Sequence, residues 1–360
     1  MLYNLVRPIL FSIDAERAHY LATNNANRIL KVPGLKTLAK CCYKYESPKL
    51  EIELFNKKFS NPFGIAAGFD KNANCLELVA ALGFGFMEIG SVSALPALGN
   101  PKPRLFRLLD DQALINRMGL NNDGAEVIAR RLKSKTLPGQ FILGINTVKT
   151  NDPNILEDKA ISDFTTAVRV LAPQADFIVL NVSCPNSGDG RTFEDANALR
   201  LLLQAMQDVR GQTPLLVKLS SDLTDSALVA ALETCEAMNV DGYVLINTTI
   251  SRDGLKTSQH QLEAIGRGGL SGAPLFERVK KTISLTYKTI AGKKPIIGVG
   301  GVSSAADAYA LFKAGASLVE VYTGFVYNGP GYAKALKRGL VKLLDRDGAG
   351  SIREIIGRGI

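Results

Sequence analysis

The stretch DFIVLNV, residues 176–182, is an apolar run that ends beside an asparagine and leads directly into the loop SCPNS, residues 183–187. Seven similar runs, rich in Val, Ile and Leu, recur along the chain: GIAAG (64–68), FGFMEIG (84–90), QFILGIN (140–146), PLLVKLS (214–220), DGYVLIN (241–247), KPIIGVGG (294–301) and SLVEVYTG (317–324). Patterns typical of amphipathic helices separate them, at 72–82, 157–171, 195–209, 224–238, 273–290, 303–314 and 331–344. Eight short strands that alternate with helices predict an α/β fold, a (β/α)8 TIM barrel, with a doubly wound sheet as the alternative.

Two long segments interrupt this alternation. Residues 91–122 follow the second expected strand, and residues 248–272 follow the sixth. Both are expected to be loops on one rim of the barrel, where long loops usually serve function. Ahead of the first barrel strand, LEIEL (50–54) and KKFSN (57–61) have the pattern of an antiparallel pair.

The N-terminal segment is basic and amphipathic. Residues 1–49 hold eight Lys and Arg against three acidic residues, a balance of +5 in a chain whose net charge is +9. Apolar residues recur at helical spacing from Leu2 to Ile13, and a second helix is expected to end at Pro33 and Gly34. We therefore expect an amphipathic helical extension over 1–45 and one barrel domain over 46–360. Such helices suit an anionic membrane surface, and simple docking onto the barrel is the alternative.

Composition excludes several classes of protein. No apolar run approaches the roughly 18 residues that cross a bilayer, and the N-terminus lacks the pattern of a signal peptide. Five cysteines and two histidines show no spacing suited to zinc, so no metal and a reducing compartment are expected. Neither the charge distribution nor a motif suggests a nucleic-acid partner. We expect a peripheral protein on the cytoplasmic side of the cell membrane.

Polar residues collect where the expected strands end. Asn181, Cys184 and Asn186 surround the end of the fourth strand, where the amides can hold a planar polar substrate and the thiol can exchange a proton with it. A buried structural cysteine between loop-capping asparagines is the alternative. Similar positions at other strands are taken by Lys71, Ser91, Asn146, Lys218, Asn247 and Thr248. Lys218 lies inside the apolar run PLLVKLS, where it needs an acceptor or an electron-rich ligand.

Glycines end the last two strands, in GVGG (298–301) and YTG (322–324), each ahead of an expected helix. Backbone N–H groups at helix N-termini bind phosphate, and barrels often hold phosphate after strands seven and eight. With GGLSG (268–272) nearby, the pattern predicts a phosphorylated cofactor or substrate.

Seven motifs resemble, in order, those of dihydroorotate dehydrogenases: AAGFDK (66–71), INRMGLNN (115–122), NVSCPNS (181–187), INTT (246–249), GGLSGAPL (268–275), IIGVGG (296–301) and VYTG (321–324). The likeness covers nearly the whole chain. LVRPILFSIDAERAH (5–19) and PRLFRL (103–108) are similar to the membrane-associated, quinone-dependent class 2 branch. The resemblance implies an FMN enzyme of pyrimidine biosynthesis that oxidises dihydroorotate to orotate and passes electrons to a membrane quinone.

The resemblance also implies roles for single residues. The FMN phosphate is expected at Ser271, Gly272, Gly300, Gly301, Tyr322 and Thr323, and the FMN ring at Ala66, Ala67, Gly68, Ser91, Asn146, Asn181 and Lys218. Substrate contacts are expected from Lys71, Asn116, Asn181, Asn186, Asn247 and Thr248, with Cys184 as the catalytic base. The quinone is expected at His19, Arg107 and Tyr322.

The chain departs from the class 2 pattern at four positions. Class 2 members carry serine where this chain has Cys184, whereas soluble class 1 enzymes carry cysteine there. Leu120 and Ser187 replace the usual Phe and Thr, and Ile246 differs beside the flavin. The alternatives are a soluble FMN oxidoreductase acting on dihydroorotate or a related cyclic amide with fumarate or NAD, a flavin-free sugar-phosphate barrel with a Lys218 Schiff base, and a catalytically silent membrane-docking barrel.

Overall fold

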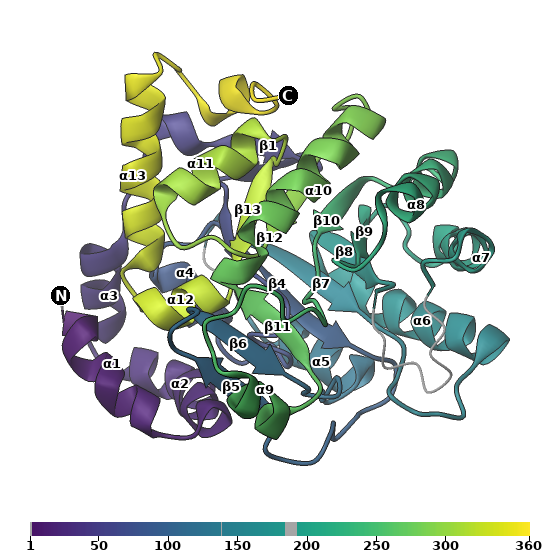
Figure 1. Ribbon diagram of the computed structural model, residues 1–360, viewed down its shortest axis with the longest axis horizontal. Coiled ribbons are helices and arrows are strands. Elements are labelled where there is room, and N and C mark those ends of the chain that lie inside the picture. The colour runs from purple at the N-terminus through teal and green to yellow at the C-terminus, as the bar shows by residue number, and fades with distance from the viewer. Residues whose placement is uncertain (1, 138, 184–192) are drawn as a thin grey trace.

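The eight expected barrel strands form a closed, all-parallel barrel in the computed structural model, which describes residues 2–137, 139–183 and 193–360 (Figure 1). Its strands follow one another around the barrel in chain order: β3 (Phe63–Ile65), β4 (Phe86–Val92), β7 (Ile142–Thr147), β8 (Phe177–Asn181), β9 (Leu215–Leu219), β10 (Gly242–Leu245), β12 (Ile296–Val299) and β13 (Leu318–Val321). The TIM-barrel prediction is confirmed, and the doubly wound sheet is excluded.

Helices surround the barrel at the places that the amphipathic patterns predict and at two further places, 125–133 and 323–328. They are α4 (Leu76–Ala81), α5 (Ala125–Lys133), α6 (Glu157–Leu171), α7 (Ala196–Gln207), α8 (Asp225–Ala237), α10 (Phe276–Thr289), α11 (Ala305–Lys313), α12 (Thr323–Asn328) and α13 (Tyr332–Arg346). Short 3-10 turns lie at Pro48–Leu50, Ala172–Gln174, Ala273–Leu275 and Ile352–Ile355. Side-chain caps explain several starts: Asp195, Thr224 and Ser304 each accept hydrogen bonds from backbone N–H groups of the first turn that follows.

The barrel interior changes from apolar to charged along its axis. At the amino-terminal end, the Phe86 ring packs so closely on Gly64 that a Cβ on that glycine would lie 2.5 Å from it. Two residues further along β4, on the same side of the strand, stands Glu88. Lys218 on β9 and Glu320 on β13 are likewise buried. The floor beneath the carboxyl ends of the strands is therefore polar, although the amino-terminal end of the barrel is apolar.

A hairpin closes the amino-terminal end of the barrel. Strands β1 (Ile52–Leu54) and β2 (Lys57–Phe59) pair antiparallel, as the sequence predicts. Phe59 of this hairpin contacts Phe86 with ring centroids 5.6 Å apart, and Phe55 contacts Phe177 at 5.7 Å. These aromatic contacts fill this end with apolar side chains, opposite the carboxyl ends of the strands.

The two segments predicted to be long loops instead contain strands that pair with each other. Strands β5 (Leu105–Leu108) and β6 (Ala113–Asn116) come from the first segment, and β11 (Gly269–Gly272) comes from the second, which also contains α9 (Gln259–Ile265). They form an antiparallel sheet in the order β11-β6-β5. The prediction of plain loops is wrong: β5 and β6 are four-residue strands that form a local hairpin, and β11 joins β6 across about 150 positions of sequence, which no local pattern reveals.

The N-terminal extension comprises three helices rather than the two predicted: α1 (Leu2–Ser12), α2 (Ala15–Lys31) and α3 (Leu35–Tyr43). They lie side by side along one edge of the molecule, next to α12 and α13 (Figure 1). Pro33 and Gly34 end the second helix as expected, but the chain starts a third directly after them. No helix in the described ranges is both long enough and apolar enough to cross a membrane.

A buried ion pair fastens the extension to the sheet above the barrel. Arg104 contacts Glu16 of α2 through Nη2 and Oε1 at 2.8 Å, and both side chains are almost fully buried. The same guanidinium donates to the carbonyl oxygens of Leu98 and Asn100. The guanidinium therefore keeps this whole set of partners only while α2 is docked against the sheet.

We expect Glu16→Ala to weaken this docking by about 3–5 kcal/mol, because it leaves a buried guanidinium without its counter-ion. Amide hydrogen exchange should accelerate in α1 and α2 while the barrel strands stay protected. The matched control is Glu46→Ala, which removes the exposed Lys44–Glu46 pair and should cost less than about 1 kcal/mol. Equal protection of α2 in both variants would contradict the anchoring role of Glu16.

Candidate active site

A cavity of about 1210 Å³ opens at the carboxyl ends of the barrel strands, beneath the β11-β6-β5 sheet. It brings together side chains and backbone from most of the strands. The predicted site residues that line it are Ala66, Ala67, Gly68, Lys71, Ser91, Asn116, Asn181, Lys218, Asn247, Thr248, Ser271, Gly272, Gly300, Gly301, Tyr322 and Thr323. Cys184, Asn186 and Ser187 lie outside the described residues.

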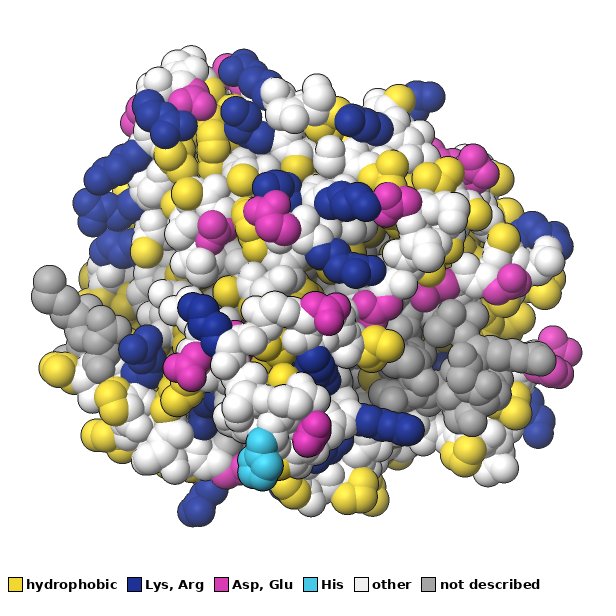
Figure 2. Space-filling model, in the orientation of Figure 1, with side chains coloured by type: hydrophobic (Ala, Val, Ile, Leu, Met, Phe, Trp, Pro, Cys, Tyr) yellow, Lys and Arg dark blue, Asp and Glu magenta, His cyan; other side chains and the backbone are white. Residues whose placement is uncertain are grey.

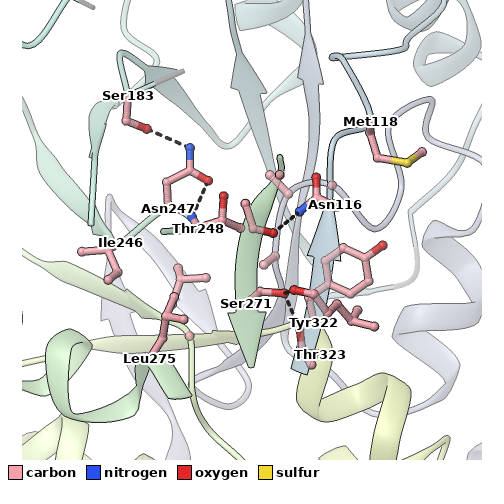
Figure 3. Close-up of a pocket in the computed structure, with 18 of the residues that line it drawn as sticks. Asn116, Met118, Ser183, Ile246, Asn247, Thr248, Ser271, Leu275, Tyr322 and Thr323 are labelled. Carbon is pink, nitrogen blue, oxygen red and sulfur yellow. Dashed lines mark hydrogen bonds between the residues drawn. The ribbon is translucent and has the colours of Figure 1, made fainter. Parts of the chain in front are cut away.

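A hydrogen-bonded amide network forms one wall of the cavity (Figure 3). Asn247 donates to Ser183 Oγ at 2.8 Å, and Ser183 donates to Asn181 Oδ1 at 2.9 Å. Asn181 in turn donates to Ser91 Oγ at 3.2 Å, and Asn247 Oδ1 accepts from the Thr248 N–H. The network fixes the side chains at the ends of β4, β8 and β10 relative to one another. It can therefore present preorganised donors and acceptors to a planar polar ligand.

The lysine in the fifth strand has the acceptor that its burial requires. Lys218 Nζ lies 3.3 Å from Glu88 Oε1, and Asn146 Nδ2 donates to the same oxygen at 2.8 Å. Asn146 is fully buried behind the cavity and is not among its lining residues, so it supports the wall through Glu88. The Lys218 ammonium is thus held as a fixed positive charge at the cavity floor.

Glycine backbone forms the opposite end of the cavity. Gly272, Gly300 and Gly301 all have positive φ, at 109°, 118° and 73°. A Cβ on Gly301 would lie 2.4 Å from the Phe276 Cα at the start of α10, so only glycine lets the chain approach this helix. Beside them, the Ser271 and Thr323 hydroxyls are 2.8 Å apart (Figure 3). Backbone N–H groups of lining glycines beside hydroxyls suit a phosphate.

Lys71 and Asn116 face the cavity from two different elements. Lys71, in the loop after β3, donates to the Gly68 carbonyl at 2.6 Å. Desolvation of its ammonium group, followed by the charge of Arg104, lowers the Lys71 pKa to about 8. Asn116 ends β6 and donates to the Gly269 carbonyl at 3.4 Å. The cavity therefore combines a cation of lowered pKa with neutral amides, a set suited to a carboxylate on a planar ring.

Two of the three residues expected at the quinone lie near each other. The His19 ring of α2 contacts Phe69 at 5.2 Å and Tyr322 at 6.3 Å, which links the N-terminal helices to the cavity wall. Desolvation and the charge of Lys71 lower the His19 pKa to about 3, so the imidazole is neutral. Arg107, the third, donates to the carbonyls of Leu10, Phe11 and Ile13 at the end of α1.

A sequence model of the family described as dihydroorotate dehydrogenase matches residues 49–344. The chain belongs to the dihydroorotate dehydrogenase family. A protein from Natronomonas pharaonis named dihydroorotate dehydrogenase (quinone) is 42% identical over 356 residues, covering 99% of both chains. One of the same name from Thermobifida fusca is 39% identical over 365 residues, covering 99% of this chain and 96% of its own. The crystal structure of DHODH in complex with ferulenol from Eimeria tenella superposes with a TM-score of 0.80 at 32% identity, covering 93% of this chain and 98% of that one.

Sequence reasoning misses several residues in and around this cavity. Ser183 joins two predicted asparagines, but the sequence marks it only as part of a loop. Glu88 and Glu320 are charged residues inside apolar runs, MEIG and LVEV, the same signal that identifies Lys218. Arg104 gives no local signal, because its counter-ion Glu16 is 88 positions away.

Proposed function

We propose that this protein oxidises dihydroorotate to orotate with FMN as its resident cofactor, and that a membrane quinone receives the electrons. The observation that supports this best is the cavity, which joins a glycine-lined phosphate cradle, a buried lysine and an amide network in one space. In the net reaction the substrate loses two hydrogen atoms, and the quinone gains them as a quinol.

The residues present fit FMN. Gly272, Gly300 and Gly301 line the cavity in backbone conformations with positive φ that favour glycine, and Ser271 and Thr323 add hydroxyls for the phosphate. At the ring we assign Ala66, Ala67, Gly68, Ser91, Asn181 and Lys218, all from the cavity lining. FMN supplies, when bound, the hydride acceptor that amino-acid side chains lack. Lys218 contributes positive charge where negative charge develops during reduction.

For the substrate we assign Lys71 to the carboxylate and the asparagines to the ring amides. Asn116, Asn181, Asn247 and Thr248 surround the same space, and Asn186 is assigned from the sequence. Cys184 is proposed as the base that takes the proton from C5. A thiol, which ordinarily has a pKa of about 8.5, is a better proton acceptor near neutral pH than a hydroxyl.

The pH dependence of orotate binding tests the assignment of Lys71. Because its pKa is lowered to about 8, the free enzyme loses this positive charge as the pH rises through 8. We expect the Kd of orotate to rise about tenfold per pH unit above that point and to level off below it. Titration of the flavin spectrum with orotate measures it. Lys71→Met should bind weakly with no inflection near pH 8, and an unchanged pH profile in that variant would contradict the assignment.

The N-terminal helices are proposed as the membrane-binding and quinone-access segment. Leu5 and Ile9 of α1 are 74% and 66% exposed although both are large and apolar, and Leu38 of α3 is 57% exposed. Hydrophobic side chains appear along the edge of the molecule where α1 and α2 lie, with Lys and Arg beside them (Figure 2). Apolar residues in a basic surround favour the interface of an anionic bilayer. His19 and Tyr322 then lie between this surface and the cavity.

The double variant Leu5→Ser/Ile9→Ser tests membrane binding without removing a buried contact. Each side chain contributes about 1.5–3 kcal/mol when buried in lipid, so affinity for phosphatidylglycerol vesicles should fall roughly 100-fold or more. Reduction of a soluble dye should be unaffected. The control is Leu201→Ser on α7, an exposed leucine on the opposite side of the molecule (Figure 1), which should leave vesicle binding unchanged. Equal binding by both variants would refute the membrane assignment.

Anaerobic bleaching of the flavin by dihydroorotate tests the proposed function as a whole. The expected results are FMN in the purified protein, complete bleaching by dihydroorotate and recovery of colour with a quinone. Recovery with fumarate or NAD instead would favour the soluble oxidoreductase. A colourless protein that cannot bind FMN would overturn the proposal.

A further inference from the structure

Three ionisable side chains gather inside the barrel, beneath the cavity. Glu88 of β4 and Glu320 of β13 are fully buried, and Lys218 of β9 is 4% exposed. Lys218 and Glu320 both line the cavity, so whatever lies on its floor meets both of them. We call Lys218, Glu88 and Glu320 the floor triad.

The charges of the floor triad do not sum to zero if all three side chains are ionised. Two carboxylates and one ammonium would leave a net negative charge out of contact with water, at a cost of several kcal/mol. When two carboxyl groups lie close together in such a place, the pKa of one of them is raised and that group keeps its proton. The buried surroundings therefore require one of the two glutamates to be neutral.

Hydrogen bonding identifies which glutamate carries the charge. Glu88 Oε1 accepts from Asn146 and lies 3.3 Å from Lys218 Nζ, the contacts that stabilise a carboxylate. Neither oxygen of Glu320 has a hydrogen-bond partner among the described residues, and Glu88 Oε2 has none either. Burial, followed by the negative charge of Glu88, raises the pKa of Glu320 well above its usual range.

We infer that Glu320 is a neutral carboxylic acid that directs its proton toward Glu88, so that the floor triad has no net charge beside the cavity. Glu320 is then a positioning residue: it holds Glu88, and through Glu88 the ammonium of Lys218. An ionised Glu320 would place an extra negative charge where the reduction of FMN adds one, and would lower the flavin midpoint potential. The inference rests on the proposed function in one respect only, that FMN is the group above the triad.

Infrared spectroscopy of the purified protein tests the protonation directly. The difference between protein with and without ¹³C-labelled glutamate should contain the carbonyl stretching band of a protonated carboxyl group. That band should be lost in Glu320→Gln. Its absence from the wild type, or its persistence in Glu320→Gln, would overturn the inference. The measurement needs no bound flavin, so a failure of the proposed function would not affect it.

A double-mutant cycle on the flavin midpoint potential provides the second readout. Glu320→Gln removes no charge, and in Glu88→Gln the proton of Glu320 can leave so that Glu320 becomes the partner of Lys218. Each single variant should therefore shift the potential little. The double variant leaves Lys218 uncompensated and should shift the potential to clearly more positive values, by more than the sum of the single shifts. A shift in Glu320→Gln alone as large as in the double variant would show that Glu320 is ionised and would overturn the inference.

Discussion

Lys218→Ala is expected to slow reduction of the bound flavin by dihydroorotate roughly 10²- to 10³-fold, the effect of removing one preorganised charge from a site where charge develops. The lysine lies 3.3 Å from Glu88 and almost fully out of water, so its position is fixed before the reaction begins. Anaerobic stopped-flow measurement of the reductive half-reaction gives the rate, and the flavin absorbance gives the FMN content.

Lys337→Met is the matched control for this variant. Lys337 of α13 is also a buried lysine, at 2% exposure, but it donates to the Gly83 carbonyl and is not among the cavity-lining residues. Its replacement should lower stability without slowing flavin reduction. If Lys218→Ala were reduced at the wild-type rate with a full complement of FMN, Lys218 would have no role in the chemistry.

Cys184→Ala is expected to lower the same rate by about 10²- to 10⁴-fold, the usual contribution of a general base. Cys184→Ser should retain part of the activity, with its pH profile displaced upward, since a hydroxyl accepts a proton less readily than a thiol at neutral pH. The measurement is flavin reduction by dihydroorotate across a range of pH. A wild-type rate in Cys184→Ala would move the search for the base to Ser183, which the structure places in the amide network.

Alkylation offers an independent test of the thiol. Cys41 and Cys42 are exposed and should be replaced by serine first, whereas Cys75 and Cys235 are buried. Burial raises the pKa of both buried thiols, that of Cys235 to about 12, so neither should react at neutral pH. In this background iodoacetamide should inactivate the enzyme by modifying Cys184, and orotate should protect it. Inactivation without a modified Cys184 peptide would contradict the assignment.

Local patterns in the sequence are sufficient for the barrel and for much of its mouth. Apolar runs at regular intervals predict buried parallel strands, and parallel strands place their carboxyl ends on one rim, so the sequence alone assigns residues such as Asn181 and Asn247 to one cavity. The sequence places the glycines after β12 on the same rim for the same reason. A charged residue inside an apolar run likewise identifies Lys218.

Only the tertiary structure decided which buried polar and charged residues contact one another. Lys218 and Glu88 are 130 positions apart, and Arg104 and Glu16 are 88 apart, so no periodicity connects them. The sheet above the cavity pairs Asn116 with Gly269, and a sequence read segment by segment shows only two loops there. Asn146, which is predicted at the FMN ring, donates to Glu88 across 58 positions, a contact that the sequence does not show. Hydrophobic periodicity reports which side of an element is buried, but the neighbour of a buried polar group is set by how distant elements pack, and this determines the charge of the cavity floor.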